Sequence, residues 1–435
     1  MKILHTSDWH LGQHFMGKSR REEHKAFIEW LLTVVERESI EAVIIAGDVF
    51  DTGSPPSYAR EIYHQLVLEM RARECQLVVI AGNHDSVSML NESKSLLAYL
   101  DVQVISQADL TDLDSHVVPL KDRQGNEAAW LCAVPYLRPK DMMQSQSGQS
   151  EQDKKEGLLQ QIKDFYLSLY QRATQRNADR KKQLPIIGTG HLTAFGSQLS
   201  ESVRDLYVGT LDTLPTSVFP PFDYLALGHI HRPQAIGNNG CFRYSGSPIA
   251  LSFDELGRDK SVVILDTELL STAMLSKDSN VMTDLFAEQE EPVVLKPIPC
   301  FQPMVSLQGD LQSLLSQIEG LSCEEGKTIW LEVSVLADEY LSDLHKQLLQ
   351  AVEGKPIELL RVMRRRTQGE TSMAFIERQT LSELSVEEVF DRSVTASLDL
   401  KDEEKTALSQ LFQQCLEDVN EHTEGHGKAQ EEAVE

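Results

Sequence analysis

Five short polar motifs, each following a run of mostly apolar residues, constrain the fold of this 435-residue chain more than any other feature. In chain order the motifs are Asp8-Trp9-His10, Gly47-Asp48, Gly82-Asn83-His84-Asp85, Gly190-His191 and Gly228-His229-Ile230-His231. The runs before them are rich in Val, Ile and Leu, a composition typical of buried strands. Polar residues at the ends of several buried strands predict a sheet with one chemically active edge.

The first half of the chain alternates strand and helix patterns. Apolar spacing predicts strands at 2–6, 42–46 and 76–81, with helices at 23–38 and 58–73 between them. This β-α-β-α-β order predicts a largely parallel sheet covered by helices, with functional residues beyond the carboxyl ends of its strands. Further segments are expected as strands at 130–134, 185–189, 224–227 and 261–265 and as a helix at 157–176.

The length of the chain favours more than one domain, since a single core rarely grows past ~250–300 residues. An acidic stretch at 279–292 precedes a second β-α-β-α-β pattern. Its expected elements are strands at 304–307, 329–335 and 357–363 and helices at 311–321 and 340–352. We therefore expect a first domain over 1–280, an accessory domain over 290–375, helices within 380–420 and a disordered acidic tail over 421–435. The apolar stripes of the helices within 380–420 fit either packing on their own chain or docking to another protein.

The composition limits the classes of partner and compartment. Lys and Arg number 41 against 67 Asp and Glu, so the net charge of −26 argues against nucleic-acid binding over the whole surface. A DNA substrate would need local basic patches, bound metals or a partner protein. The six cysteines are scattered without a Cys-x-x-Cys pair, which indicates reduced thiols. With no secretion signal and no run of about 18 apolar residues, we expect a cytoplasmic protein without a membrane span.

The motif side chains form a ligand set for two divalent metals. Asp, Asn and His without Cys suit Mn²⁺, Fe²⁺ or Zn²⁺ better than Ca²⁺, and the prominent oxygen ligands favour Mn²⁺. Paired metals need a bridging carboxylate, and Asp48 ends the central predicted strand. Asp8 and His10 with one histidine of the last motif would complete one metal. Asn83 and His191 with the other histidine would complete the second.

His84 and Asp85 are expected to take part in the chemistry directly. His84 lies between a predicted ligand and a carboxylate, so we assign it to transition-state stabilisation or to protonation of the leaving oxygen. Asp85 would hold the tautomer of His84. Metals bound by the other motif residues polarise phosphoryl oxygens and lower the pKa of a water molecule, so the predicted reaction is hydrolysis of a phosphate ester.

The motifs resemble those of the calcineurin-type metallophosphoesterase superfamily. Longer strings closely resemble the SbcD family, the nuclease subunits of bacterial SbcCD complexes, and the resemblance covers nearly the whole chain. Those strings span 7–12, 46–53, 81–85, 227–231, 244–248 and 380–390.

The resemblance implies a fold, an activity and a set of partners. The fold is an α/β calcineurin-like metallophosphoesterase sheet core covered by helices, with a small α+β capping domain and C-terminal docking helices. The activity is that of a DNA nuclease with two Mn²⁺ per chain, a 3′–5′ exonuclease on duplex ends and an endonuclease on hairpins or blocked ends. Such nucleases act in DNA repair, recombination and replication. The partner is an SbcC-like, SMC-type ATPase, and the nuclease chain is a homodimer within a 2:2 complex.

The resemblance also assigns residues. It gives the first metal Asp8, His10, Asp48 and His231, and the second metal Asp48, Asn83, His191 and His229, with His84 as the catalytic histidine. Basic residues follow the first motif and cluster in the accessory domain, and they fit either DNA phosphate contacts or ordinary surface charges: Lys18, Arg20, Arg21, Arg364, Arg365 and Arg366. The resemblance gives docking on the ATPase to Leu384, Val386, Val389, Phe390, Leu408, Leu411 and Phe412. Archaeal and eukaryotic relatives often have His where this chain has Asp51, so the role of that position is not transferred.

Two other function classes fit parts of the sequence. The first is a stand-alone metallophosphodiesterase or phosphatase with the same metal core. Protein phosphatases of the superfamily carry Asp-Arg-Gly after the second motif, whereas this chain has Asp51-Thr52-Gly53 and lacks that phosphate-binding arginine. The second is a scaffold without activity, which would have lost metal ligands. All seven inferred ligands are present, so the sequence favours the nuclease.

Overall fold

The computed structural model describes residues 1–142, 150–194, 197–198, 213–237, 240–271, 291–324, 326–336 and 344–365. The chain divides into two compact units, 1–367 and 368–435, and every described residue belongs to the first. The predicted docking helices, their seven apolar docking residues, the acidic tail and Arg366 therefore lie outside the described residues. No helix in the described ranges is long and apolar enough to cross a membrane.

The first sheet has six strands in the order β14-β13-β1-β4-β5-β6. Their bounds are β1 Lys2–Thr6, β4 Ala42–Ala46, β5 Gln76–Ile80, β6 Val102–Ile105, β13 Ser261–Asp266 and β14 Val293–Pro297. The four strands from β1 to β6 run parallel, while β13 pairs antiparallel with β1 and β14 pairs antiparallel with β13. The predicted strands at 2–6, 42–46 and 76–81 are confirmed, and their carboxyl ends meet at one edge of the sheet.

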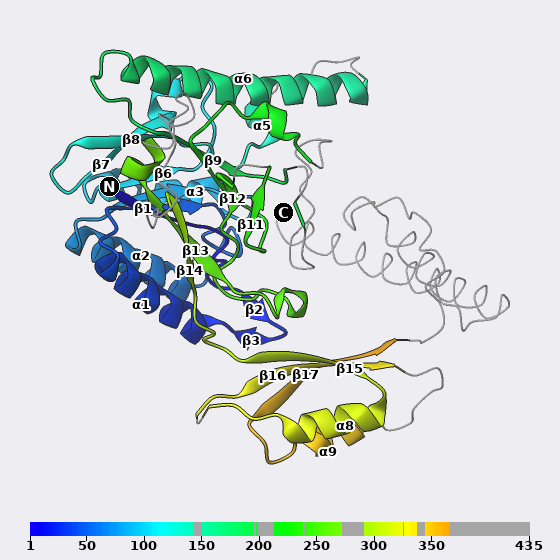
Figure 1. The fold of residues 1–435 in the computed structure, drawn as a ribbon. Coiled ribbons are helices and arrows are strands. Elements are labelled where there is room, and N and C mark those ends of the chain that lie inside the picture. The colour runs from blue at the N-terminus through cyan, green and yellow to red at the C-terminus, as the bar shows by residue number, and fades with distance from the viewer. Residues whose placement is uncertain are drawn as a thin grey trace, which may run out of the picture. The chain divides into compact units, whose positions relative to one another are not determined.

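Helices α1 (Arg21–Arg37) and α2 (Ser57–Ala72) cover the outer face of the first sheet (Figure 1). In α1 the buried residues Phe27, Leu31, Val34 and Val35 recur at spacings that place them on one side of a helix. That stripe packs with Val43 and other strand residues in one apolar cluster. Both helices were predicted from this periodicity and are confirmed to within two residues at each end.

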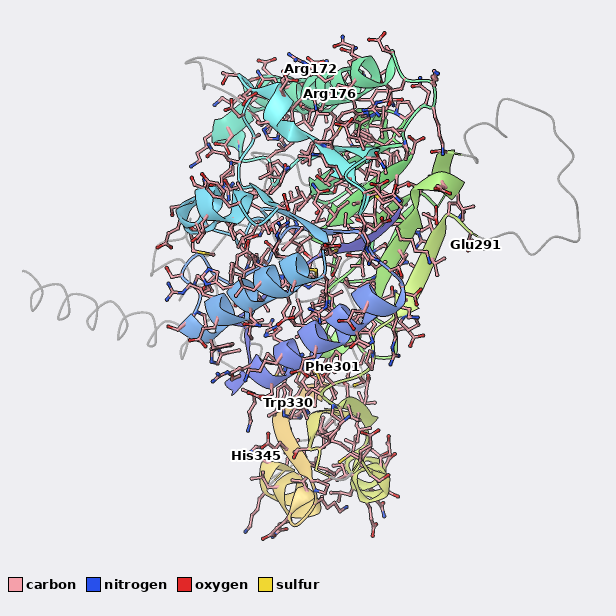
Figure 2. All side chains as sticks on the ribbon, turned by 90° about the vertical axis from the view of Figure 1, so that its left-hand side faces the viewer. Arg172, Arg176, Glu291, Phe301, Trp330 and His345 are labelled. Atoms are coloured by element: carbon pink, nitrogen blue, oxygen red, sulfur yellow. The ribbon has the colours of Figure 1, made fainter. Side chains whose placement is uncertain are left out.

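The second sheet also has six strands, in the order β11-β12-β10-β9-β8-β7. Their bounds are β7 Val117–Lys121, β8 Glu127–Cys132, β9 Ile186–His191, β10 Tyr224–Gly228, β11 Gln234–Ile236 and β12 Phe242–Tyr244. Helix α6 (Glu151–Asn177) covers its outer face (Figure 1). Arg172 and Arg176 project from α6 (Figure 2), and both guanidinium groups bond to Asp114 on the adjoining turn.

The two sheets pack face to face through a shared apolar layer. Ile3 and Ile44 of the first sheet belong to the same buried cluster as Ile187 and Ala226 of the second. Alternate residues such as Leu4 point the other way, into the cluster under α1 and α2. Strands buried on both faces read as continuous apolar runs, which explains the lack of alternation in the sequence. The sequence predicted most of these strands but not their division into two sheets.

A third sheet is formed by strands from the last three described segments. Its parallel strands are β15 Met304–Gly309, β16 Ile329–Leu336 and β17 Ile357–Arg365. Helices α8 (Leu311–Gly320) and α9 (Leu344–Val352) pack on one face of it, where Leu314, Leu331 and Leu348 form a fully buried core (Figure 1). The predicted order of strands and helices is confirmed here, with the start of the second helix described only from residue 344.

Candidate metal centre

The predicted ligands lie where strands of both large sheets end. Asp8 follows β1 and Asp48 follows β4, while His191 is the last residue of β9 and His229 directly follows β10. Backbone hydrogen bonds join the loops, since Asp8 N donates to Gly47 O at 3.0 Å and His10 N donates to Asp48 O at 3.0 Å. The turns after β1 and β4 are therefore joined to each other and are not separate loops.

Four of the predicted ligands have a left-handed backbone conformation. Their φ angles are 55° at Asp8, 48° at His10, 50° at Asp48 and 95° at His229. Non-glycine residues adopt positive φ uncommonly, at a cost of about 1–3 kcal/mol each, and such residues gather at functional sites. The sharp turn that this conformation makes after each strand brings the side chains together at the sheet edge.

Two motif glycines allow the close approach of these turns. Gly47 has a φ of 96°, and a Cβ atom there would lie 2.0 Å from Nδ1 of His191. A Cβ atom on Gly82 would lie 2.1 Å from Oδ1 of Asp48. A methyl group at either position would overlap a predicted ligand, so glycine is required by contact and, at Gly47, also by backbone conformation.

Replacing Gly47 with Ala should therefore destabilise the metal-free protein by about 2–4 kcal/mol, because the strained φ and the overlap with His191 add together. Urea unfolding in the presence of a chelator measures the change. The matched control is Gly17→Ala, where φ is 82° but nothing lies within 4 Å of the added Cβ. That variant should lose only about 1 kcal/mol. Equal losses of unfolding free energy in the two variants would show that the contact with His191 is unimportant.

The structure brings the predicted ligands into groups with metal-ligand spacing. Within each group, one ligand atom per residue lies within 4.8 Å of the others. The groups are Asp8 with His10 and His231, Asp48 with His191 and His229, and His10 with Asp48 and His84. Asn83 adjoins the second group, because its Oδ1 lies 2.9 Å from Nε2 of His191. Every predicted ligand thus lies in one constellation, centred on Asp48.

Two buried nitrogen atoms test whether a divalent metal fits this constellation. Nε2 of His10 and Nε2 of His229 are inaccessible to solvent and have no hydrogen-bond partner among the described residues. A buried polar atom without a partner costs about 1–3 kcal/mol. Each of these nitrogens belongs to a group with carboxylate oxygens, so a cation coordinated there would satisfy it. The residues present therefore fit the divalent metal that the donor set predicts.

Asp48 and His191 form a buried pair, with His191 Nε2 3.1 Å from Asp48 Oδ2. Burial alone would raise the pKa of Asp48, but the charge and hydrogen bond of His191 hold that pKa well below its usual value. Burial likewise opposes the charge on His191, yet Asp48 raises the pKa of this histidine to about 9. Nδ1 of His191 lies 3.0 Å from the carbonyl oxygen of Ala46, which can only accept, so Nδ1 carries a hydrogen and Nε2 faces the carboxylate.

Metal binding at this pair should depend on pH. With a pKa of about 9, His191 is protonated at neutral pH in the metal-free protein, whereas a coordinating imidazole must be neutral. Binding then releases a proton, and affinity should rise about tenfold per pH unit as pH increases toward the pKa of His191. Mn²⁺ titration calorimetry in buffers of different ionisation enthalpy measures both the affinity and the proton release. Affinity that does not change with pH would contradict a protonated His191.

The structure corrects the predicted role of Asp85. Its buried carboxylate accepts hydrogen bonds from the backbone amides of Val49, Phe50 and Gly82 at 3.2, 3.0 and 2.9 Å. Nδ1 of His84 lies instead 2.7 Å from the carbonyl oxygen of Asp51. Asp85 therefore ties the loop after β5 to the loop after β4, and the Asp51 backbone orients the ring of His84. Burial and the neighbouring Asp48 raise the pKa of Asp85 to about 6.

Sequence reasoning missed a carboxylate behind one of the histidines. Nδ1 of His231 lies 3.3 Å from Oε1 of the buried Glu255, and Glu255 also pairs with Lys260 at 2.5 Å. Burial would raise the pKa of Glu255, but Lys260 and the hydrogen bond with His231 hold it well below its usual value. No motif marks Glu255, so only the folded chain identifies it. Asp51 has the corresponding place at His10, with Oδ1 3.2 Å from Nδ1 of that ring.

The basic residues predicted to contact DNA have different surroundings. Arg20 is 1% exposed, and its guanidinium donates to Glu23 and to the Ala250 carbonyl and lies over the rings of Phe15 and Trp330. The prediction that Arg20 contacts DNA is therefore wrong, because its charge is enclosed by its own chain.

The other predicted DNA contacts remain at or near the surface where they are described. Lys18 is paired with Glu358 at 2.7 Å, and the side chain of Arg21 is 47% exposed. Arg364 is exposed on β17, and the backbone of Arg365 ends that strand. Lys18, Arg21 and Arg364 therefore remain candidates for phosphate contacts.

Comparisons with known proteins agree with this site. The calcineurin-like phosphoesterase family matches residues 1–233, and a family described as the type 5 capsule protein repressor C-terminal domain matches residues 300–398. The SbcD subunit of the nuclease SbcCD from Escherichia coli K12 is 44% identical over 417 residues, which are 96% of this chain and 98% of that protein. The protein of the same name from Rhodobacter capsulatus is 32% identical over 370 residues, or 82% of this chain and 86% of that protein.

The phosphoesterase match covers both large sheets as far as residue 233, and so it includes every residue of the three ligand groups. The match to relatives extends over nearly the whole chain. Together with the grouped Asp and His residues and the adjoining Asn83, these matches identify a divalent-metal-dependent hydrolase of phosphodiesters. The chain belongs to the SbcD family of calcineurin-like phosphoesterases.

Proposed function

We propose that this chain is the nuclease subunit of an ATP-dependent complex that cleaves DNA in repair, recombination and replication. It would act as a Mn²⁺-dependent 3′–5′ exonuclease on duplex ends and as an endonuclease on hairpins or blocked ends. The observation that carries the proposal is the constellation centred on Asp48, in a chain whose relatives are nuclease subunits over nearly their full length. The alternative is a stand-alone metallophosphodiesterase.

The ligand assignment follows the groups in the structure. Site 1 denotes Asp8, His10, Asp48 and His231, and site 2 denotes Asp48, Asn83, His191 and His229. We assign Asp48 as the shared carboxylate, since its Oδ2 atom lies 3.7 Å from Nε2 of His10 and 3.1 Å from Nε2 of His191. Mn²⁺ bound at these sites, two ions per chain, would supply positive charge to the phosphoryl oxygens and lower the pKa of a water molecule.

His84 is the residue we assign to proton transfer. Its backbone amide donates to Asp48 Oδ1 at 2.9 Å, which fixes the residue beside the shared carboxylate. Its Nδ1 must carry a hydrogen, because the Asp51 carbonyl oxygen 2.7 Å away can only accept. Nε2 is then the nitrogen that gains and loses a proton. A protonated Nε2 at the metal edge can donate to the oxygen that leaves when the phosphodiester is cleaved.

The negative charge of the chain means that other groups must attract DNA to it. With a net charge of −26, attraction to DNA must come from the metals, from local cations such as Lys18, Arg21 and Arg364, and from another protein. We assign residues 1–280 to the nuclease domain, 290–375 to a domain that shapes the DNA groove, and 380–420 to docking on an SMC-type ATPase. Two copies of each chain would form the complex.

The test is Mn²⁺-dependent cleavage of an end-labelled DNA hairpin, with and without the cognate ATPase and ATP. We expect cleavage that requires Mn²⁺, stops on addition of a chelator and increases strongly with the ATPase. Absence of DNA cleavage under every condition, together with Mn²⁺-dependent turnover of a small aryl phosphodiester, would replace the proposal with the stand-alone phosphodiesterase.

A further inference from the structure

Three of the four predicted histidine ligands differ in the group that the Nδ1 atom of the ring contacts. At site 1, both histidines have a carboxylate at Nδ1: Asp51 at His10 and Glu255 at His231, at 3.2 and 3.3 Å. At site 2, Nδ1 of His191 meets the neutral carbonyl oxygen of Ala46. A carboxylate behind a metal-bound imidazole fixes the ring and makes its coordinating nitrogen a stronger donor.

Glu255 is fixed by contacts in addition to the one with His231. Its Oε2 accepts from Lys260 Nζ at 2.5 Å and from the Leu251 amide at 3.1 Å. Lys260 Nζ also donates to the backbone carbonyl oxygen of His231 at 2.9 Å. The carboxylate behind the ring and the backbone that carries the ring are therefore fixed by the same ammonium group.

The ion pair between Glu255 and Lys260 is buried, and its stability alone does not explain why it is present. The side chain of Glu255 is fully buried and that of Lys260 is 11% exposed. Burying two charges costs desolvation energy that their attraction does not reliably offset, so such a pair is weak evidence for a role in stability. The contact of Glu255 with Nδ1 of His231 indicates instead that the pair orients this predicted metal ligand.

The charges of the two sites also differ. Site 1 has two carboxylate ligands, Asp8 and Asp48, whereas site 2 has Asp48 and the neutral amide of Asn83. A divalent cation gains more electrostatic energy beside two carboxylates than beside one. The charge of the ligands and the carboxylates that contact the histidines thus both favour tighter metal binding at site 1.

We propose that the two metal sites load unequally, with site 1 the tighter, and that Glu255 is a positioning residue that establishes this order through His231. The inference rests on the proposed ligand assignment. Lys260 holds Glu255 in place, and Asp51 acts in the same way on His10. Glu255 does not touch the substrate.

The test is titration of the metal-free, full-length chain with Mn²⁺ alone, followed by calorimetry and by the electron paramagnetic resonance of bound Mn²⁺. The wild-type chain should show a tight and a weak binding step. Glu255→Gln should weaken the tight step about 10- to 100-fold and leave the weak step unchanged. The matched control is Glu38→Gln, which removes another carboxylate paired with a lysine, Lys296 at 2.7 Å, at the C-terminal end of α1. It should leave both steps unchanged.

A second variant covers the case in which Glu255→Gln does not fold. Asp51→Asn changes a side chain that is 23% exposed, and it should weaken the same tight step. Two equal steps in the wild type, or loss of the weak step in either variant, would overturn the proposal. Absence of any Mn²⁺ binding by the wild-type chain would instead overturn the proposed function, so the two failures are distinguishable.

Discussion

Replacing Asp48 with Asn should abolish DNA cleavage, with a loss of at least about 10³-fold, equivalent to about 4 kcal/mol. Asn keeps one oxygen, which can still accept from the His84 amide that donates to Asp48 Oδ1 at 2.9 Å. It loses the charge that faces His10 and His191, and that charge is the element that the two proposed sites share. Mn²⁺ titration should show neither binding step at its wild-type affinity.

The variant should remain folded, because Asp48 lies at the sheet edge and not in an apolar cluster. Circular dichroism and urea unfolding of the metal-free protein check this point. Asp101→Asn is the matched control, since Asp101 is an exposed carboxylate whose ion pair is with Arg71. Retention of wild-type turnover and of two binding steps by Asp48→Asn would contradict the shared-carboxylate assignment.

Replacing His84 with Gln should lower kcat by about 10²–10⁴-fold, the usual contribution of a general acid or base. Gln has the reach to donate to the Asp51 carbonyl oxygen but cannot hold a titrating proton. Because His84 is only half-buried and fills no core position, folding should be unchanged. Single-turnover cleavage of the hairpin substrate measures the chemical step separately from DNA binding.

His84 also belongs to a group with His10 and Asp48 that has metal-ligand spacing, so Mn²⁺ titration decides between two roles. Unchanged metal binding with lowered kcat identifies proton transfer, whereas weakened binding identifies a ligand. His64→Gln, an exposed histidine on α2, controls for the loss of a surface imidazole and should have wild-type kcat.

Local structure was predictable where a single stretch of sequence determines it. The strands before Asp8, Asp48 and Asn83 were recognised because they are buried on both faces, and their ends placed the ligands on one edge. The pairing of strands was not predictable. β13 lies beside β1 although most of the first domain separates them in the sequence, and both sheets present equally apolar strands. Short strands such as β12, with three residues, carry too little pattern to detect.

The supporting side chains could not be predicted for a related reason. Arg20 is enclosed by Phe15, a few residues earlier in the chain, and by Trp330, which is distant in the sequence, so its burial appears only after folding. Glu255 resembles any acidic residue of a loop until Lys260 and His231 enclose it. Asp85 follows His84 in the chain, which suggested a contact between their side chains. Its carboxylate instead accepts hydrogen bonds from three backbone amides.

Each proposed metal site draws ligands from both large sheets, and this has a consequence for the lifetime of the protein. The turns after β1, β4 and β5 supply one part of the centre, and β9 with the turn after β10 supplies the rest. Ions bound at these sites would therefore connect one sheet to the other. A ligand whose free concentration is a hundred times its dissociation constant adds about 2.7 kcal/mol to the free energy of unfolding. A cell short of the divalent metal would then lose this protein to proteases as well as its activity, so metal supply would set its abundance.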